Sequence, residues 1–143
     1  MIRDVRHTGI VVTDLEAALR FYRDLLGFRE TKRLEESGAY IDNMLALDGA
    51  QVTTVKLTAP DGNLVELLHF RSHPRPRPPP PEACRIGITH IAFTVEDLEH
   101  MHSALTAAGV RFNAPPQLSP DGYAKVTFCR DPDGTLIELV QVL

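Results

Sequence analysis

The first 70 residues alternate between apolar and polar positions in a way that predicts a strand, a helix and then further strands. Over residues 5–12 the apolar side chains of Ile10 and Val12 fall on one face of an extended chain, and His7 falls on the other. Thr13, with Glu16 three residues later, has the form of a helix capping box. Apolar residues then recur at helical spacing up to the glycine at 27, at Leu15, Leu19, Tyr22 and Leu26.

The segment after this helix predicts three strands. Between residues 28 and 57 we expect strands with turns at Ser37–Gly38 and Asp48–Gly49, and residues 51–57 are rich in β-branched side chains. A turn at residues 60–62 leads into a last strand over 63–70. The predicted order is therefore βαβββ.

The second half of the chain repeats this order. A strand over residues 88–95 precedes a helix that starts near Asp97 and ends at Gly109, followed by strands near 111–112, 124–129 and 135–142. The predicted fold is α+β, with two tandem βαβββ modules at residues 1–71 and 86–143 that together make one domain. Residues 72–85 contain six prolines and predict a spacer, which is favoured over an SH3 ligand and reaches roughly 40 Å when extended.

A histidine opens each copy of the repeat, and a glutamate lies near the end of each copy. His7 and His90 each stand seven residues before an aspartate, and Glu66 and Glu138 each stand five residues after one. A carboxylate in an apolar strand is costly to bury unless it is paired or bound to a metal. Any one of these four residues alone would favour a structural role, but the repeated pairing favours one divalent metal site made by two histidines and two glutamates.

The composition of the chain argues against some classes of binding partner. The net charge of −4 and the lack of a basic stripe argue against nucleic acid, and no apolar run is long enough to span a bilayer. The N-terminus does not resemble a signal peptide, and the two cysteines, Cys84 and Cys129, form neither a CxxC motif nor a disulfide framework. We therefore expect a cytoplasmic protein with reduced thiols and with no nucleic-acid or membrane partner.

Several other polar residues are weaker candidates for a role in the metal site or its pocket. We expect His69 to face the helix as a structural residue and Cys129 to be a packing residue rather than a nucleophile. Three histidines are expected to be solvated, namely His73, His100 and His102. Pocket-lining roles stay open for Tyr40, Asp42, Asn43 and Lys125.

These motifs resemble the vicinal oxygen chelate superfamily, which includes glyoxalases, bleomycin-resistance proteins and extradiol dioxygenases. The motifs that carry the resemblance are His7 to Asp14, the run Leu15 to Phe28, Val65–Leu67, His90 to Leu98, and Asp131 to Leu139. The resemblance implies paired modules that form a cupped sheet around one metal ion. It places His7, Glu66, His90 and Glu138 at the ligand positions.

This ligand set is similar to that of bacterial-type glyoxalase I. Methylmalonyl-CoA epimerases commonly have a different ligand at the Glu66 position, extradiol dioxygenases use two His and one Glu, and resistance proteins often lack the ligands. The resemblance implies a divalent ion (Ni, Zn, Co, Mn or Fe) and a small-molecule substrate that binds it through neighbouring oxygens and is enolised. It also implies a homodimer. Glu138 or Glu66 is the candidate base. An extradiol-type dioxygenase and a non-enzymatic small-ligand-binding protein are the alternatives.

Overall fold

The computed structural model describes residues 1–143 and divides the chain into two compact units, Met1–Arg77 and Pro78–Leu143. Each unit contains one four-stranded mixed sheet. The boundary between the units falls within the Pro-rich stretch 72–85. The α+β class and the repeated βαβββ order predicted from the sequence are confirmed.

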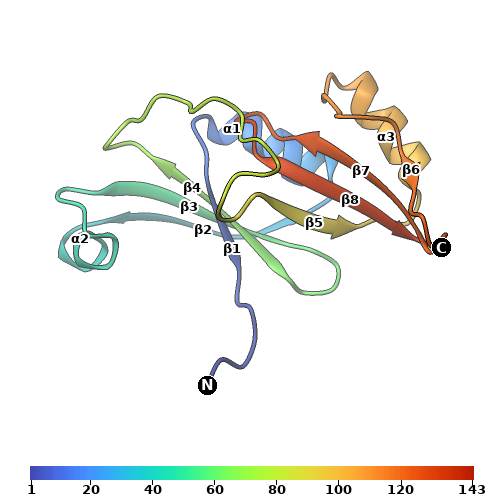
Figure 1. The fold of residues 1–143 in the computed structure, drawn as a ribbon. Helices are drawn as coiled ribbons and strands as arrows, with labels where there is room; N and C mark the ends of the chain where they lie inside the picture. The colour runs from blue at the N-terminus through green and yellow to red at the C-terminus, as the bar shows by residue number, and fades with distance from the viewer. The chain divides into compact units, whose positions relative to one another are not determined.

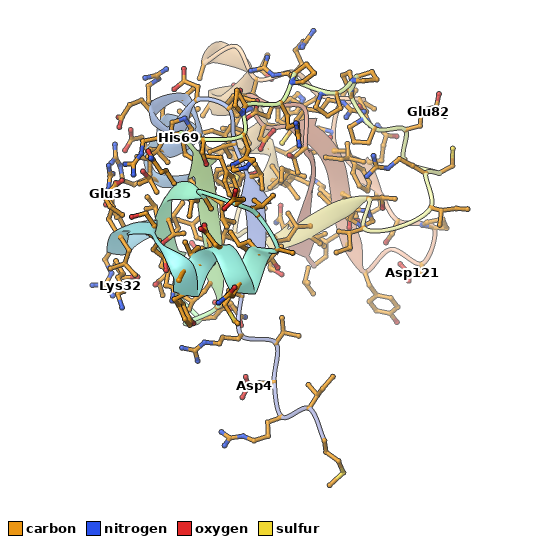
Figure 2. The ribbon with its side chains drawn as sticks, turned by 90° about the vertical axis from the view of Figure 1, so that its left-hand side faces the viewer. Asp4, Lys32, Glu35, His69, Glu82 and Asp121 are labelled. Carbon is orange, nitrogen blue, oxygen red and sulfur yellow. The ribbon has the colours of Figure 1, made fainter.

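The first unit has seven elements. In chain order they are β1 (Thr8–Val11), α1 (Leu15–Leu19), the π-helical turn η1 (Arg20–Leu25), β2 (Arg29–Ser37), α2 (Ala39–Leu45), β3 (Gln51–Thr58) and β4 (Leu64–Phe70). The strand order is β1-β4-β3-β2, in which β1 is parallel to β4 and the other pairs are antiparallel (Figure 1). The N-terminal segment that carries Asp4 extends away from this sheet before β1 begins (Figure 2).

The second unit repeats this topology with fewer elements. In chain order they are β5 (His90–Thr94), α3 (Leu98–Ala107), β6 (Gln117–Leu118), β7 (Ala124–Arg130) and β8 (Leu136–Val142). The strand order β5-β8-β7-β6 matches that of the first unit, and β5 is again parallel to β8 (Figure 1). The strand expected at residues 111–112 is reduced to one bridge between Phe112 and Cys129.

An aspartate caps the first helix of each unit. The Asp14 carboxylate accepts a hydrogen bond from the Ala17 backbone N–H at 2.9 Å, and Asp97 accepts one from the His100 N–H at 2.9 Å. The capping box predicted at Thr13 is therefore wrong by one residue. Because each aspartate follows its histidine by seven residues, the cap fixes where the helix starts relative to the strand that carries the histidine.

The helix α2 is a correction to the predicted run of strands. The turns expected at Ser37–Gly38 and Asp48–Gly49 do flank the segment, but the residues between them form a helix. The Asp42 carboxylate accepts hydrogen bonds from Gly49 N–H at 3.1 Å and Ala50 N–H at 2.7 Å, which ties the helix to the start of β3. The helix buries Ile41 against Ala50 and Val52, with Leu68 and Phe70 also packed there. Asp42 therefore has a structural role.

The two faces of the first sheet differ in burial. Alternate residues of β3 and β4 that share one face are fully buried or nearly so, namely Val55, Leu57, Val65 and Leu67. This face packs against the buried residues Leu19 and Tyr22 of α1 and η1. The opposite face carries α2 at one end and leaves Lys56 and Glu66 only partly covered.

Candidate metal centre

The first His–Glu pair lies at the junction of β1 and β4. The parallel register places Gly9 opposite Glu66, so His7, two residues before Gly9, projects to the same face as Glu66. The His7 Nε2 atom is 3.2 Å from the Glu66 Oε2 atom, and the Glu66 side chain is 14% exposed. On its other side, the Glu66 Oε1 atom is 3.8 Å from the Lys56 Nζ atom.

The second unit contains an equivalent pair. The register of β5 with β8 places Ala92 opposite Glu138, so His90 shares the face of Glu138. The His90 Nε2 atom is 3.3 Å from the Glu138 Oε2 atom, with the Glu138 side chain 21% exposed. The Thr89 hydroxyl lies 2.9 Å from the His90 Nδ1 atom. This contact helps to fix the orientation of the imidazole ring.

Both pairs have the separation expected of two neighbouring ligands on one metal ion. Metal–nitrogen and metal–oxygen bonds of about 2.0–2.2 Å, at angles of about 90–110°, place the two donor atoms roughly 2.9–3.4 Å apart. The observed distances of 3.2 and 3.3 Å fall in this range. Neither unit by itself gathers three or more His, Cys, Asp or Glu side chains suited to a metal ion. Each unit brings together one histidine and one glutamate.

The cross-strand neighbours of the two glutamates were not among the residues predicted from the sequence. Lys56 of β3 pairs in register with Glu66, and Phe128 of β7 pairs with Glu138. The Phe128 ring makes an edge contact with the His90 ring, with centroids 5.4 Å apart. The signal was present in the repeat, because each residue stands ten positions before its glutamate. Aligning the two copies would have shown that a lysine and a phenylalanine occupy equivalent positions.

The structure also places the weaker candidates. The pairing of His69 with Thr53 puts His69 on the face opposite Glu66, as predicted. Lys125 pairs in register with Gln141 and forms an ion pair with Glu99 of α3 at 3.0 Å, so it lies on the helix side of its sheet. Lys125 therefore does not share the face of the sheet that carries Glu138.

Two of the three histidines expected in solvent are partly covered. His102 packs against the Phe112 ring with centroids 4.4 Å apart, and the His73 Nδ1 atom lies 2.9 Å from the Ser72 hydroxyl. Only His100 is exposed as predicted. Tyr40 and Asn43 lie on the exposed side of α2. None of these residues joins either His–Glu pair.

Cys129 is a packing residue, as predicted. Its side chain is fully buried, and both cysteines are free thiols. Burial, and secondarily the charge of Asp131, raises the pKa of the Cys129 thiol to about 12. A thiol with such a pKa does not ionise near neutral pH, which rules out a nucleophilic role.

The fold and the repeated His–Glu pairs define a class of small tandem-repeat proteins, and comparison with known proteins identifies the family. Residues 4–139 match the Glyoxalase/Bleomycin resistance protein/Dioxygenase superfamily, and the chain belongs to it. The predicted resemblance is thereby confirmed.

Related chains extend over almost the whole sequence. The uncharacterized protein YaeR of Escherichia coli is 31% identical over 141 residues, covering 98% of this chain and 97% of YaeR. The ethylmalonyl-CoA/methylmalonyl-CoA epimerase of Cereibacter sphaeroides is 34% identical over 147 residues, covering 99% of this chain and all of that protein. The lactoylglutathione lyase of Schizosaccharomyces pombe is 30% identical over 143 residues, covering 95% of this chain but only 46% of that enzyme.

A solved structure of a glyoxalase family protein from Bacillus cereus shares the fold. It superposes with a TM-score of 0.90 at 24% identity, covering the whole of this chain and 96% of that one. None of the helices in this chain has the length and apolar character that crossing a membrane requires.

Proposed function

We propose that this protein is a metal-dependent lyase or isomerase of the glyoxalase type that binds one divalent ion through His7, Glu66, His90 and Glu138. The observation that carries the proposal is the repeated His–Glu pair, with donor atoms 3.2 and 3.3 Å apart at equivalent register positions. Two imidazoles and two carboxylates suit Ni, Zn, Co, Mn or Fe as divalent ions. The similarity to a lactoylglutathione lyase and to an acyl-CoA epimerase supports lyase or isomerase chemistry.

The proposed reaction is removal of a proton next to a carbonyl group of a small oxygenated substrate. A bound divalent ion supplies Lewis-acid stabilisation of the negative charge that develops on the substrate oxygen. Glu138 is the proposed base, because its carboxylate has no lysine or arginine partner in its unit and pairs in register with the apolar Phe128. Glu66 is the proposed permanent ligand, because its side chain is more covered, at 14% exposed against 21% for Glu138. A positioned base of this kind contributes about 10²- to 10⁴-fold in rate.

Metal content tests the ligand assignment directly. Purified wild-type protein is expected to contain or take up about one divalent ion per chain, and His90→Ala is expected to lose most of it. His100→Ala is the matched control, since His100 is exposed on α3 and bonds through its backbone to Asp97. Bound metal should also raise the Tm of the wild type by mass action. Equal metal content in wild type and His90→Ala would refute the assignment of these ligands.

We propose that all four ligands come from one chain, which also forms a homodimer, and that the protein works in the cytoplasm. The stretch 72–85 supports the first point because an extended Pro-rich spacer reaches roughly 40 Å, and the two free thiols suit a reducing compartment. Aerobic oxygen uptake with catechols would instead indicate an extradiol-type dioxygenase. Metal-free protein that still binds a small molecule would indicate a binding protein.

A further inference from the structure

The two halves of the proposed ligand set differ in what lies across the strand pair from each glutamate. In the first unit Lys56 pairs with Glu66, and in the second unit Phe128 pairs with Glu138. The repeat has thus kept its His–Glu pairs while placing a cation beside one and an aromatic ring beside the other. Nothing in the fold requires a charge here, since the equivalent phenylalanine supports the same strand order in the second unit.

Lys56 does not stand alone on its face of the sheet. The register of β2 with β3 puts Lys32 directly across from Lys56, so two ammonium groups accompany the single carboxylate of Glu66. The next carboxylate on this face is that of Glu36, four residues along β2 from Lys32 and roughly 13 Å away by strand geometry. Glu36 already accepts a hydrogen bond from Thr54 at 3.0 Å. The surroundings of Glu66 therefore carry a local surplus of positive charge.

A divalent ion bound to Glu66 increases that surplus. The Lys56 Nζ atom is 3.8 Å from Glu66 Oε1, while His7 contacts the other oxygen, Oε2. A divalent ion bound to Glu66 would neutralise the carboxylate charge that now pairs with Lys56. The ammonium group of Lys56 would then lie near a dication. Like charges at such a separation repel, and the ammonium side chain is only one-quarter exposed. A negatively charged ligand at this point relieves the repulsion.

We propose, on the basis of the function proposed above, that Lys56 makes the metal-loaded site selective for small anionic substrates, namely 2-oxo or 2-hydroxy carboxylates. The ammonium group then binds the carboxylate that neighbours the metal-binding oxygen of the substrate. Lys56 thereby sets substrate specificity without acting as an acid or base.

A matched pair of ligands tests this specificity on the full chain loaded with Mn²⁺. Pyruvate and methyl pyruvate both offer neighbouring oxygens, but only pyruvate carries a charge. Their affinities are measured through the change in water-proton relaxation caused by the bound Mn²⁺. Wild type is expected to prefer pyruvate, and Lys56→Met is expected to reduce that preference about tenfold, the effect of one charge-assisted hydrogen bond. Lys56→Arg keeps the charge and should keep most of the preference.

Two further measurements separate this role from a purely structural one. Lys56→Met is expected to bind Mn²⁺ at least as tightly as wild type, because a repelling cation is gone. Lys125→Met removes the same charge from the helix side of the other sheet and should leave the preference unchanged. Lys56→Gln replaces Lys56→Met if the latter does not fold.

The outcomes distinguish the inference from the function on which it rests. Wild type that binds no Mn²⁺ overturns both. Wild type that binds Mn²⁺ but shows the same pyruvate preference as Lys56→Met overturns the role of Lys56 alone. Weaker Mn²⁺ binding in Lys56→Met than in Lys56→Arg also overturns it, because the lysine would then be supporting Glu66 as a ligand.

Discussion

The turn that leads into β8 depends on one buried carboxylate, that of Asp131. The Asp131 Oδ1 atom accepts hydrogen bonds from the backbone N–H groups of Asp133 at 2.9 Å and Thr135 at 2.8 Å, and the residue is 5% exposed. The equivalent position in the first unit is Ala59, and both turns close with the same backbone bond, at 2.9 Å from Gly62 and at 3.0 Å from Gly134. Asp131→Ala should therefore keep the backbone bond that closes the turn and lose the carboxylate acceptor.

The cost follows from those two hydrogen bonds. A hydrogen bond to a charged group contributes about 1.5–3 kcal/mol, and two bonds that share one carboxylate oxygen are less than additive. We expect Asp131→Ala to destabilise the second unit by about 3 kcal/mol. Since about 1.36 kcal/mol corresponds to a factor of ten, the opening equilibrium of this unit should rise roughly 10²-fold. The strand that follows the turn carries Glu138, so the same change loosens the proposed base.

Cys129 reports this opening because it lies two residues from Asp131 and is fully buried. In a Cys84→Ser background, Cys129 is the single thiol, and its labelling by a thiol reagent requires the unit to open. When opening is fast relative to labelling, the rate follows the opening equilibrium and should rise about 10²-fold in Asp131→Ala.

Asp131→Asn is the control for this measurement. Asparagine keeps an oxygen acceptor but removes the charge that contributes to the raised pKa of the Cys129 thiol. We expect a much smaller rise in labelling rate for this variant. Labelling rates that rise equally in Asp131→Ala and Asp131→Asn, or a rise below about threefold in the former, would refute the argument from lost hydrogen bonds.

Three further predictions concern the candidate metal centre and the loss of stability at acid pH. Glu138→Gln is expected to keep the fold but to slow solvent exchange of the α-proton of a 2-oxo substrate, measured by NMR, by about 10²-fold or more. Exchange at the wild-type rate in both Glu138→Gln and Glu66→Gln would exclude a carboxylate base. A mixture of His7→Ala with Glu138→Ala is expected to bind no more metal than either variant alone, whereas restored binding would show that ligands come from two chains. The Glu30 carboxylate has a pKa below its usual 4.5, chiefly because Arg33 donates hydrogen bonds to it, so its contribution to stability is present above about pH 4.5 and is lost as pH falls through the lowered pKa. The difference in urea midpoint between wild type and Glu30→Gln should accordingly be present at neutral pH and shrink as the pH falls below 4.5. A difference that acid leaves unchanged would contradict this.

Local patterns in the sequence were enough to predict both βαβββ units and the pairing of each histidine with its glutamate. Alternation with a period of two assigns His7 and Glu66 to one face wherever their strands pair, and the repeat supplies the same result for His90 and Glu138. These inferences hold because a strand fixes side-chain direction through the backbone alone. The extra helix α2 could not be found in this way, since it buries only Ile41 and owes its stability to packing and to a carboxylate that reaches β3.

Register decided what local pattern could not. The sequence places Lys56 in an ordinary strand, and only the pairing of β3 with β4 brings its ammonium group to Glu66. The same holds for Phe128 beside Glu138, and for Lys125, whose pairing turns it towards α3 and away from the proposed site. Cross-strand neighbours depend on the length of the intervening turn and on the register that buries the apolar face. Both are properties of the folded sheet. The sequence therefore determined which residues are candidate metal ligands, and the tertiary structure determined which charges surround them.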